Sequence, residues 1–523
     1  MKKQLLPWQE SCLKAWEANG FRGIANVTTG AGKTILAVAA IHRLMCVADR
    51  IHNLKIKIVV PKTFLMYQWH SVMMEELQIP RTAIGFFSGA YKSDPGKLVM
   101  LYVVNSARDV LARHITEDIS RGNSVFLIAD ECHHYGASSN ARIFGYRPHI
   151  PKEAPIYTLG LSATPWCTNY LEVLVPALGE EIYSFNFLAA LRAEVINRFS
   201  LFNISISFSP EEWRIYDELS DQLGLALFKL REVYPGLSGK GTSSFFSLLE
   251  DIIRHSDPET ADLAKAVLSL SMQRMELIYQ AQYRIDCVVE LVRRLPKGKK
   301  IIIFGERIET AVEIGRRLQV LYPNEVGIYH SQSPKDLNMF TLRQFKDRDI
   351  RILVSCKTLD EGLDIAETDV GIVVSSTGSR RQRIQRLGRV LRKKPGAERA
   401  YFYYLFVGGT NEEEDLLKEM LLPEFDRHVT RVHLQYDEEE GTFNNHQYRG
   451  WEADIVQDMT ESGHSPEAVI EFMRNADRGL LSDHWLMPEA LCRKKIDAAC
   501  HIDERNYFIA MLMIIRARVG TRA

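Results

Sequence analysis

Two short segments carry residues whose types and order suit the hydrolysis of a nucleoside triphosphate. Residues 28–34 read Thr-Thr-Gly-Ala-Gly-Lys-Thr, between a short apolar run and a helical pattern. Glycines let the backbone approach a phosphate closely, and the N–H groups that open the following helix attract the anion. In such a loop the lysine reaches the β- and γ-phosphates and the last hydroxyl holds Mg²⁺. The predicted ATP-binding residues of the loop are Thr29, Gly30, Ala31, Gly32, Lys33 and Thr34.

One position departs from the complete phosphate-loop pattern, because Val27 stands where the full pattern has glycine. The second segment, residues 130–133, reads Asp-Glu-Cys-His directly after the apolar run Val125–Ala129. In open α/β sheets, ligands bind at the carboxyl ends of the strands. We therefore predict that Asp130, together with Thr34, holds Mg²⁺, and that Glu131 orients and deprotonates the attacking water.

The elements that must position these residues read as two series of buried parallel strands. Continuous apolar, β-branched runs alternate with helical patterns, which is typical of doubly wound α/β sheets. The first series contains Ile24–Val27, Lys57–Val60, Ile84–Phe87, Leu98–Val104, Val125–Ala129 and Tyr157–Leu161. The second contains Lys300–Phe304, Val326–Tyr329, Ile350–Val354, Gly371–Ser375 and Arg399–Phe406.

Between and after these series the pattern is helical. We predict an α/β protein with two tandem doubly wound parallel-sheet domains, a helical insertion between them and a mostly helical C-terminal region. The expected boundaries are 1–200 for the ATP-binding domain, 201–285 for the insertion, 286–408 for the second domain and 409–523 for an acidic accessory domain. No strand series is expected after residue 408. The insertion's aromatic residues pack in a helical core or, alternatively, stack against bases.

Charge is distributed unevenly along the 523 residues, although the net charge is −1. Residues 409–523 hold 13 Lys and Arg against 23 Asp and Glu, while residues 1–408 hold 52 against 43. A basic body with an acidic tail is typical of a nucleic-acid motor that carries a different C-terminal module, which forms a helical core or a surface for a protein partner. Alternatively, the acidic runs are solvated loops and helix starts. The eight cysteines include no C-x-x-C pair, and no apolar stretch is long enough to span a bilayer. We therefore expect a cytoplasmic protein with reduced thiols.

Further segments, added to the phosphate loop and the Asp-Glu-Cys-His segment, resemble the motifs of superfamily 2 helicases of the DEAD/DEAH-like class, in the XPB-type branch. Residues 6–9 resemble the segment whose glutamine, here Gln9, contacts adenine. Residues 161–165, Leu-Ser-Ala-Thr-Pro, resemble the motif that couples hydrolysis to strand movement. The coupling residues that this implies are His133, Ser162, Ala163 and Thr164. The resemblance also implies nucleic-acid contacts in the first half by Pro61, Lys62, Gln68, Asn105 and Ser106.

The second half carries three matching segments. Residues 303–307 match the motif that opens the second RecA-like domain, residues 359–365 contain the family's Glu-Gly-x-Asp pattern, and residues 385–392 match the arginine-finger motif. The resemblance implies nucleic-acid contacts by Arg307 and Thr358 and ATP contacts by Gly362 and Asp364. It assigns Gln385, Arg389 and Arg392 to catalysis, in addition to Lys33, Asp130 and Glu131.

The resulting expectation is a nucleic-acid-stimulated ATP hydrolase, a helicase or translocase that uses ATP and Mg²⁺ and acts on DNA rather than RNA. DNA repair, recombination or defence is the expected setting. Three alternatives stay open at this point: the motor subunit of a restriction or anti-phage complex, an ATP-dependent nucleic-acid clamp, and an RNA helicase.

Overall fold

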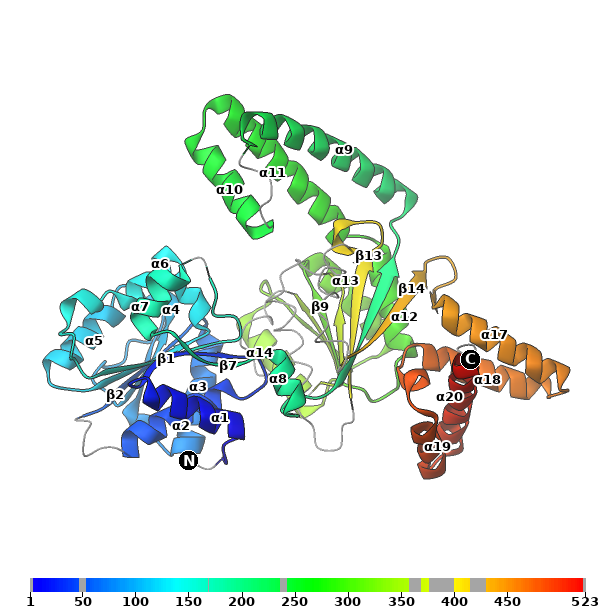
Figure 1. Ribbon diagram of the computed structural model, residues 1–523, viewed down its shortest axis with the longest axis horizontal. Coiled ribbons are helices and arrows are strands. Elements are labelled where there is room, and N and C mark those ends of the chain that lie inside the picture. The colour runs from blue at the N-terminus through cyan, green and yellow to red at the C-terminus, as the bar shows by residue number, and fades with distance from the viewer. Residues whose placement is uncertain are drawn as a thin grey trace. The chain divides into compact units, whose positions relative to one another are not determined.

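The computed structural model describes residues 3–46, 53–167, 169–235, 242–356, 368–375, 399–413 and 429–520. The described chain divides into two compact units (Figure 1). The first contains residues up to Arg198, and the second contains most of the described chain from Phe199 onward. Each unit is built around its own sheet.

The first unit contains a seven-stranded sheet with strand order β3-β4-β2-β5-β6-β1-β7, and all of its pairings are parallel. Its strands are β1 (Arg22–Val27), β2 (Lys55–Val60), β3 (Ile84–Phe87), β4 (Val99–Val103), β5 (Val125–Asp130), β6 (Ile156–Ser162) and β7 (Glu181–Phe185). The central strand β5 is buried along its whole length, as expected for a parallel sheet covered on both faces. The carboxyl ends of β1, β5 and β6 therefore lie next to one another.

Helices cover both faces of this sheet, with α1, α2 and α3 on one side and α4 to α7 on the other (Figure 1). The helices are α1 (Pro7–Ala18), α2 (Lys33–Cys46), α3 (Thr63–Leu77), α4 (Val104–Ala107), α5 (Leu111–Ser120), α6 (Ser138–Ala141), α7 (Val175–Leu178) and α8 (Phe187–Arg192). Trp16 on α1 and Trp69 on α3 are fully buried against the sheet. The indole N–H of Trp16 donates to the carbonyl of Thr158, and that of Trp69 donates to the carboxylate of Asp130.

The second unit contains an eight-stranded sheet with strand order β10-β11-β9-β12-β13-β8-β14-β15. Its strands are β8 (Phe199–Ile206), β9 (Ile301–Gly305), β10 (Val326–Tyr329), β11 (Ile352–Cys356), β12 (Val370–Val373), β13 (Ala400–Val407), β14 (Val429–Asp437) and β15 (Thr442–Asn444). β8 and β14 pair in parallel over seven residues, from Phe199 opposite Val429 to Ser205 opposite Gln435. β15 pairs antiparallel with β14 and ends the sheet.

Three long helices, α9 (Pro210–Val233), α10 (Thr242–His255) and α11 (Pro258–Tyr279), form a bundle that projects from the second sheet (Figure 1). The chain enters α9 through a capping box, in which Ser209 and Glu212 satisfy each other's backbone N–H groups before Pro210 opens the helix. The bundle has its own small core, formed by Leu223, Leu230, Leu249, Ile252, Ala264 and Val267. Most of the insertion's aromatic residues pack in cores, whereas Phe228 is 60% exposed.

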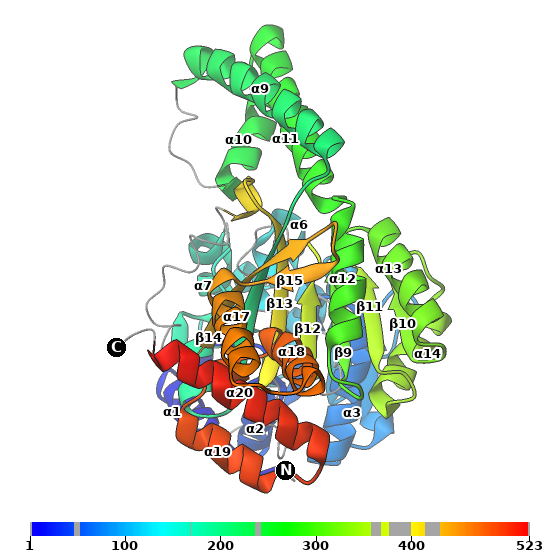
Figure 2. The same cartoon turned by 90° about the vertical axis from the view of Figure 1, so that its right-hand side faces the viewer.

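The remaining helices of the second unit flank the sheet or follow it. They are α12 (Tyr283–Arg294), α13 (Ile308–Leu321), α14 (Lys335–Asp347), α17 (His446–Glu461), α18 (Pro466–Leu480), α19 (Glu489–Ala498) and α20 (Ile502–Gly520). The last four gather together in Figure 2 around a core that includes Trp485 and Met511. Buried hydrogen bonds join them to the sheet, since Ser200 of β8 donates to Asp483 over 2.8 Å and Tyr403 of β13 donates to the carbonyl of Leu481 over 2.7 Å. Across the described residues, none of the helices has the length and hydropathy that a bilayer span requires.

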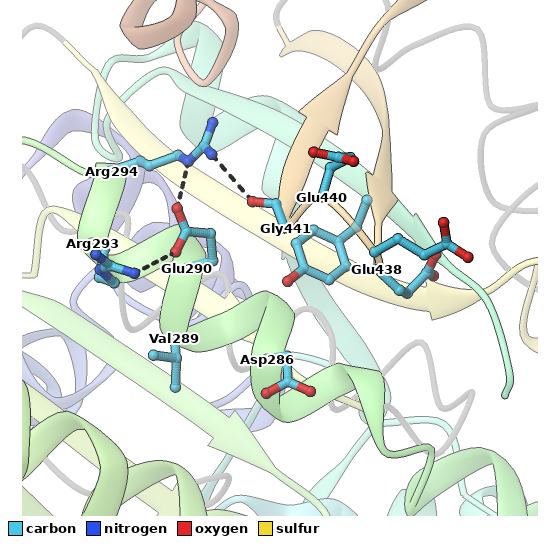
Figure 3. Close-up of a pocket in the computed structure, with 10 residues that line it drawn as sticks. Asp286, Val289, Glu290, Arg293, Arg294, Glu438, Glu440 and Gly441 are labelled. Carbon is cyan, nitrogen blue, oxygen red and sulfur yellow. Dashed lines mark hydrogen bonds and ion pairs between the residues drawn. The ribbon is translucent and has the colours of Figure 1, made fainter.

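A surface pocket of about 490 Å³ lies between α12 and the β14–β15 hairpin (Figure 3). Arg294 crosses it, donating to Glu290 over 2.7 Å and to the carbonyl of Gly441 over 3.1 Å. Arg294 and Arg449 both also bind the carboxylate of Asp477 on α18. The charged groups here hold the hairpin and α18 to α12, and no phosphate-loop residue lines the pocket.

The fold agrees with the predicted class, and all eleven predicted strands form. The structure corrects the expectations in four places, because β7, β8, β14 and β15 had not been predicted. Residues 201–206 form a strand of the second sheet rather than the start of a helical insertion, and the tail supplies two strands before it becomes helical. The polar positions Arg431, His433 and Gln435 conceal β14 in the sequence. The four-part division of the chain stays a prediction.

Candidate active site at the carboxyl edge of the first sheet

The segment between β1 and α2 has the backbone of a phosphate loop. Gly30 and Gly32 have φ values of 81° and 101°, which favour glycine over any residue with a side chain. A Cβ at Gly32 would also lie 3.0 Å from Nε2 of Gln9. Lys33 opens α2, so that the loop leads directly into a helix N-terminus. This arrangement of glycine turns and helix start provides an anion-binding surface.

Gln9 braces this loop from α1. Its Oε1 accepts the backbone N–H of Leu6 over 2.9 Å, and its Nε2 donates to the carbonyl of Gly32 over 3.0 Å. Gln9 is 2% exposed, so its amide is packed between α1 and the loop. On the other side, the N–H of Thr28 donates to the carbonyl of Phe185 in β7 over 3.0 Å. The residue predicted to contact adenine therefore fixes the loop in this structure.

Asp130 ends β5 and Glu131 directly follows it, where Glu131 pairs with Lys33 of the phosphate loop. Lys33 Nζ is 3.0 Å from Glu131 Oε1, and both side chains are about nine-tenths buried. Asp130 accepts two hydrogen bonds, one from the indole N–H of Trp69 over 2.8 Å and one from the backbone N–H of Glu131 over 3.0 Å. Glu131 has a left-handed backbone with φ of 48°, a conformation that costs energy for a residue with a side chain.

The electrostatics of this edge favour a cation. Burial first, and then the neighbouring Glu131, raise the pKa of Asp130 from 3.8 to about 6, against the opposing effect of Lys33. Two buried carboxylates thus share one nearby ammonium group. Carboxylate and hydroxyl oxygens are the hard ligands that Mg²⁺ takes together with substrate phosphates. The donor set of Asp130 and Thr34 fits that ion.

The coupling residues are connected to the carboxylate of Glu131. His133 Nδ1 is 2.9 Å from Ser162 Oγ at the end of β6 and 3.6 Å from Glu131 Oε2. Ser162 Oγ in turn accepts the backbone N–H of Thr164 over 3.0 Å, across Ala163. The four predicted coupling residues therefore form one continuous chain with the Lys33–Glu131 pair.

The first-unit residues predicted to contact nucleic acid lie at the same edge of the sheet. Pro61 and Lys62 follow β2 and precede α3, which carries Gln68, while Asn105 and Ser106 lie in α4 after β4. Because β4, β2 and β5 are neighbours, these segments flank the Asp-Glu-Cys-His segment. Asn105 is exposed and the other four are at least partly accessible.

The second-unit predictions fall into two groups. Arg307 follows β9 and pairs through Nε and Nη2 with Glu276 at the end of α11, with its guanidinium over the ring of Tyr279. The other predicted residues lie outside the described ranges, and these are Thr358, Gly362, Asp364, Gln385, Arg389 and Arg392.

Three residues have roles at this edge that the sequence did not reveal. Trp69 orients Asp130, and Tyr135 donates to the carbonyls of Asp130 and Val59. Asn140 donates to the carbonyl of His134. Trp69 lies within an apolar helical pattern, where an aromatic residue reads as ordinary core. No local pattern marks Asn140.

Two family models match the chain. The model described as type III restriction enzyme, res subunit, matches residues 2–166, and the helicase conserved C-terminal domain matches residues 283–394. The DNA 3'-5' translocase XPB2 of Sulfurisphaera tokodaii is 29% identical over 397 residues, which cover 75% of this chain and 80% of that protein. The chain is a superfamily 2 helicase of the XPB type. It is therefore an ATP-hydrolysing motor enzyme that acts on nucleic acid.

Other relatives of this XPB-type helicase are more distant or longer. The XPB subunit of the general transcription and DNA repair factor IIH of Encephalitozoon cuniculi is 24% identical over 422 residues, and the match covers 77% of this chain but 52% of that protein. The chain thus spans about half the length of that relative.

Solved structures of low identity share the fold of this XPB-type helicase. The match to the DNA-bound type ISP restriction-modification enzyme LlaBIII covers all of this chain and 40% of that enzyme, at 12% identity and a TM-score of 0.52. Dbp5 of S. cerevisiae, bound to RNA and ADP BeF3, covers 83% of this chain with 90% of its own length, at 13% identity and a TM-score of 0.51.

Proposed function

We propose that this protein is an ATP-dependent DNA translocase or helicase in which hydrolysis at the carboxyl edge of the first sheet drives movement along DNA. The observation that carries the proposal is the continuous polar chain from Lys33 through Glu131 and His133 to Ser162. It joins the phosphate loop to the coupling motif through side chains within one compact unit. A change at the bound nucleotide can therefore reach the coupling motif that contains Ser162.

In the proposed mechanism, Lys33 changes partner when ATP binds. Its ammonium group lies 3.0 Å from Glu131, and the γ-phosphate competes with Glu131 for it. Once the phosphate takes the ammonium group, Glu131 loses its neutralising partner and becomes a stronger base for the attacking water. Thr34 and Asp130 would hold Mg²⁺, which would supply charge neutralisation at the phosphates.

Residues of the later helicase motifs carry the remaining proposed roles. Arg389 and Arg392 of the arginine-finger motif stabilise the charge on the transferring phosphoryl group, with Gln385 beside them. Gly362 and Asp364 contact the nucleotide, and Thr358 contacts nucleic acid.

DNA is the proposed track, and DNA repair, recombination or defence is the proposed setting. The names of the XPB relatives specify DNA. Residues 1–408 carry nine more basic than acidic residues, which supports a polyanionic ligand. In this proposal Lys62, Gln68, Asn105 and Ser106 contact the nucleic-acid backbone, and such contacts carry no sequence information.

The test is steady-state ATP hydrolysis by the full chain with no polymer, single-stranded DNA, duplex DNA, forked DNA or RNA. Lys33→Ala serves as the blank for contaminating ATPases. We expect strong stimulation by at least one form of DNA and weak stimulation by RNA. Equal stimulation by RNA would contradict the choice of DNA.

A second candidate is the motor subunit of a restriction or anti-phage complex, and the match to the res-subunit family model favours it. In that case a protein partner docks on residues 409–523 and gates the motor. It predicts a slow, polymer-independent rate for the chain by itself and recovery of stimulation when the partner is added. An ATP-dependent clamp predicts the same slow rate together with tight binding of DNA in the presence of a non-hydrolysable ATP analogue.

A further inference from the structure

Two side chains connect α4, which carries proposed nucleic-acid contacts, to the Asp-Glu-Cys-His segment. Arg108 directly follows α4, and its Nε donates to Oδ1 of Asn140 over 2.7 Å. Nδ2 of Asn140 donates to the backbone carbonyl of His134 over 2.8 Å. Asn140 itself lies in the one-turn helix α6. The arginine thus reaches the turn after β5 through a single intervening amide.

The outer end of this connection suits a phosphate. A guanidinium group has three nitrogens, and only Nε of Arg108 is used. Its two terminal nitrogens have no partner among the described residues, and the side chain is partly accessible. Asn105 lies three residues before Arg108, so that both project from the same side of the helical turn. A backbone phosphate held beside Asn105 can therefore also bind the free end of Arg108.

The inner end of the connection reaches a strained turn. The N–H of His134 donates to the carbonyl of Glu131 over 3.0 Å, and Glu131 has φ of 48°. The imidazole rings of His133 and His134 lie 4.3 Å apart, and His133 contacts both Glu131 and Ser162. A shift of the His134 carbonyl would therefore move the turn that aims the Glu131 carboxylate.

We propose that Arg108 and Asn140 are positioning residues that transmit the occupation of α4 by a nucleic-acid phosphate to Glu131. This relay rests on the proposed function, since it explains how the polymer stimulates hydrolysis. A phosphate on Arg108 changes the hydrogen bond to Asn140, and Asn140 passes the change to the His134 carbonyl. Neither residue belongs to the phosphate loop or to the proposed catalytic residues.

The experiment compares polymer-stimulated ATP hydrolysis by the full chain and its variants. Asn140→Asp keeps an acceptor for Arg108 but removes the donor to the His134 carbonyl, while Asn140→Ala removes both. We expect each variant to lower the maximal stimulation about 2- to 30-fold. The DNA concentration that gives half-maximal stimulation stays as in the wild type, because Asn140 does not touch DNA.

Arg108→Ala and the double variant complete the cycle. Arg108→Ala should lower maximal stimulation and also raise the half-maximal DNA concentration. The double variant Arg108→Ala/Asn140→Ala should lose no more maximal stimulation than the larger single loss, since residues that act through one bond are not additive. Arg113→Ala, which removes an exposed arginine paired with Glu117 on α5, is the charge-matched control and should behave as the wild type.

Three outcomes would overturn the relay but leave the proposed function standing. They are full stimulation in Asn140→Asp, equal losses of basal and stimulated rates that follow a lowered melting temperature, and additive losses in the double variant. A wild-type chain that no polymer stimulates would instead overturn the proposed function, and the relay with it.

Discussion

The carboxyl edges of the two sheets are built from similar strands but hold charge in opposite ways. At the first edge, Asp130 and Glu131 crowd a single ammonium group, and the pKa of Asp130 is raised to about 6. At the second edge, Arg284 is fully buried and donates to the carbonyls of Ile278 at the end of α11, Val374 and Leu405, and to the carboxylate of Glu412. The first edge keeps negative charge that a bound cation can neutralise. At the second edge, Glu412 and the three carbonyls already balance the charge of Arg284.

The two edges share one type of fold, but the first has the properties of a functional site and the second those of a stabilising contact. The first edge accepts strain at Glu131 and excess charge at Asp130, which are properties that functional sites have at some cost in stability. At the second edge, Arg284 joins the end of α11 to the ends of two strands and to Glu412. It thereby fixes the base of the helical insertion to its sheet.

The largest expected effect comes from Glu131→Gln, which removes the base but keeps the shape. Turnover should fall about 10²- to 10⁴-fold, the usual contribution of a general base, while ATP still binds. Single-turnover hydrolysis and binding of a fluorescent ATP analogue measure the two properties separately. A loss of turnover smaller than tenfold would mean that Glu131 is not the base.

The second effect is on folding and concerns the other edge. Arg284→Met removes the guanidinium that neutralises the Glu412 carboxylate and donates to three carbonyls, so we expect the free energy of unfolding to fall by about 3–5 kcal/mol. Denaturant unfolding followed by circular dichroism measures this loss. Arg214→Met, in an exposed pair with Glu211, should change the unfolding midpoint little. Equal midpoints for the two variants would remove the structural role of Arg284.

A smaller effect is expected from Trp69→Phe, which deletes the donor that orients Asp130. Partners of this kind typically contribute 10- to 100-fold, and turnover should fall by about that factor at subsaturating Mg²⁺. Trp16→Phe is the matched control, because Trp16 is equally buried and donates to the carbonyl of Thr158 over 2.9 Å. Comparable turnover in both variants would show that the Trp69 hydrogen bond is merely structural.

The smallest effect concerns pH. The pKa of Asp130 is raised on folding, so its ionised form destabilises the folded chain above about pH 6, and this cost disappears as the pH falls towards 3.8. Asp130→Asn should therefore raise the melting temperature by about 2–4 °C at pH 8 and by less near pH 4. Asp118→Asn breaks the buried ion pair between Asp118 and Lys57, so this variant should instead have a lower melting temperature than the wild type. A loss of stability in Asp130→Asn at pH 8 would contradict the charge imbalance at the first edge.

Much of the fold followed from local patterns. Every predicted strand formed, because buried parallel strands read as uninterrupted apolar runs. The strands that escaped prediction are those with polar positions, such as β14, or with mostly partly exposed residues, such as β7. β8 and β14 find each other across a long stretch of chain, and no local pattern encodes which distant strand completes a sheet edge.

The phosphate loop, the acidic strand end and the order of the helicase motifs can all be recognised in the amino-acid sequence alone. Their chemistry lies in residue types and in backbone preferences over a few positions, such as glycine at positive φ before a helix. Three contacts became visible only in the folded chain: Gln9 braces Gly32, Trp69 holds Asp130, and Arg108 reaches His134 through Asn140. Such contacts depend on how separate elements pack, because a side chain's partner is set by the three-dimensional arrangement and not by its neighbours in the chain.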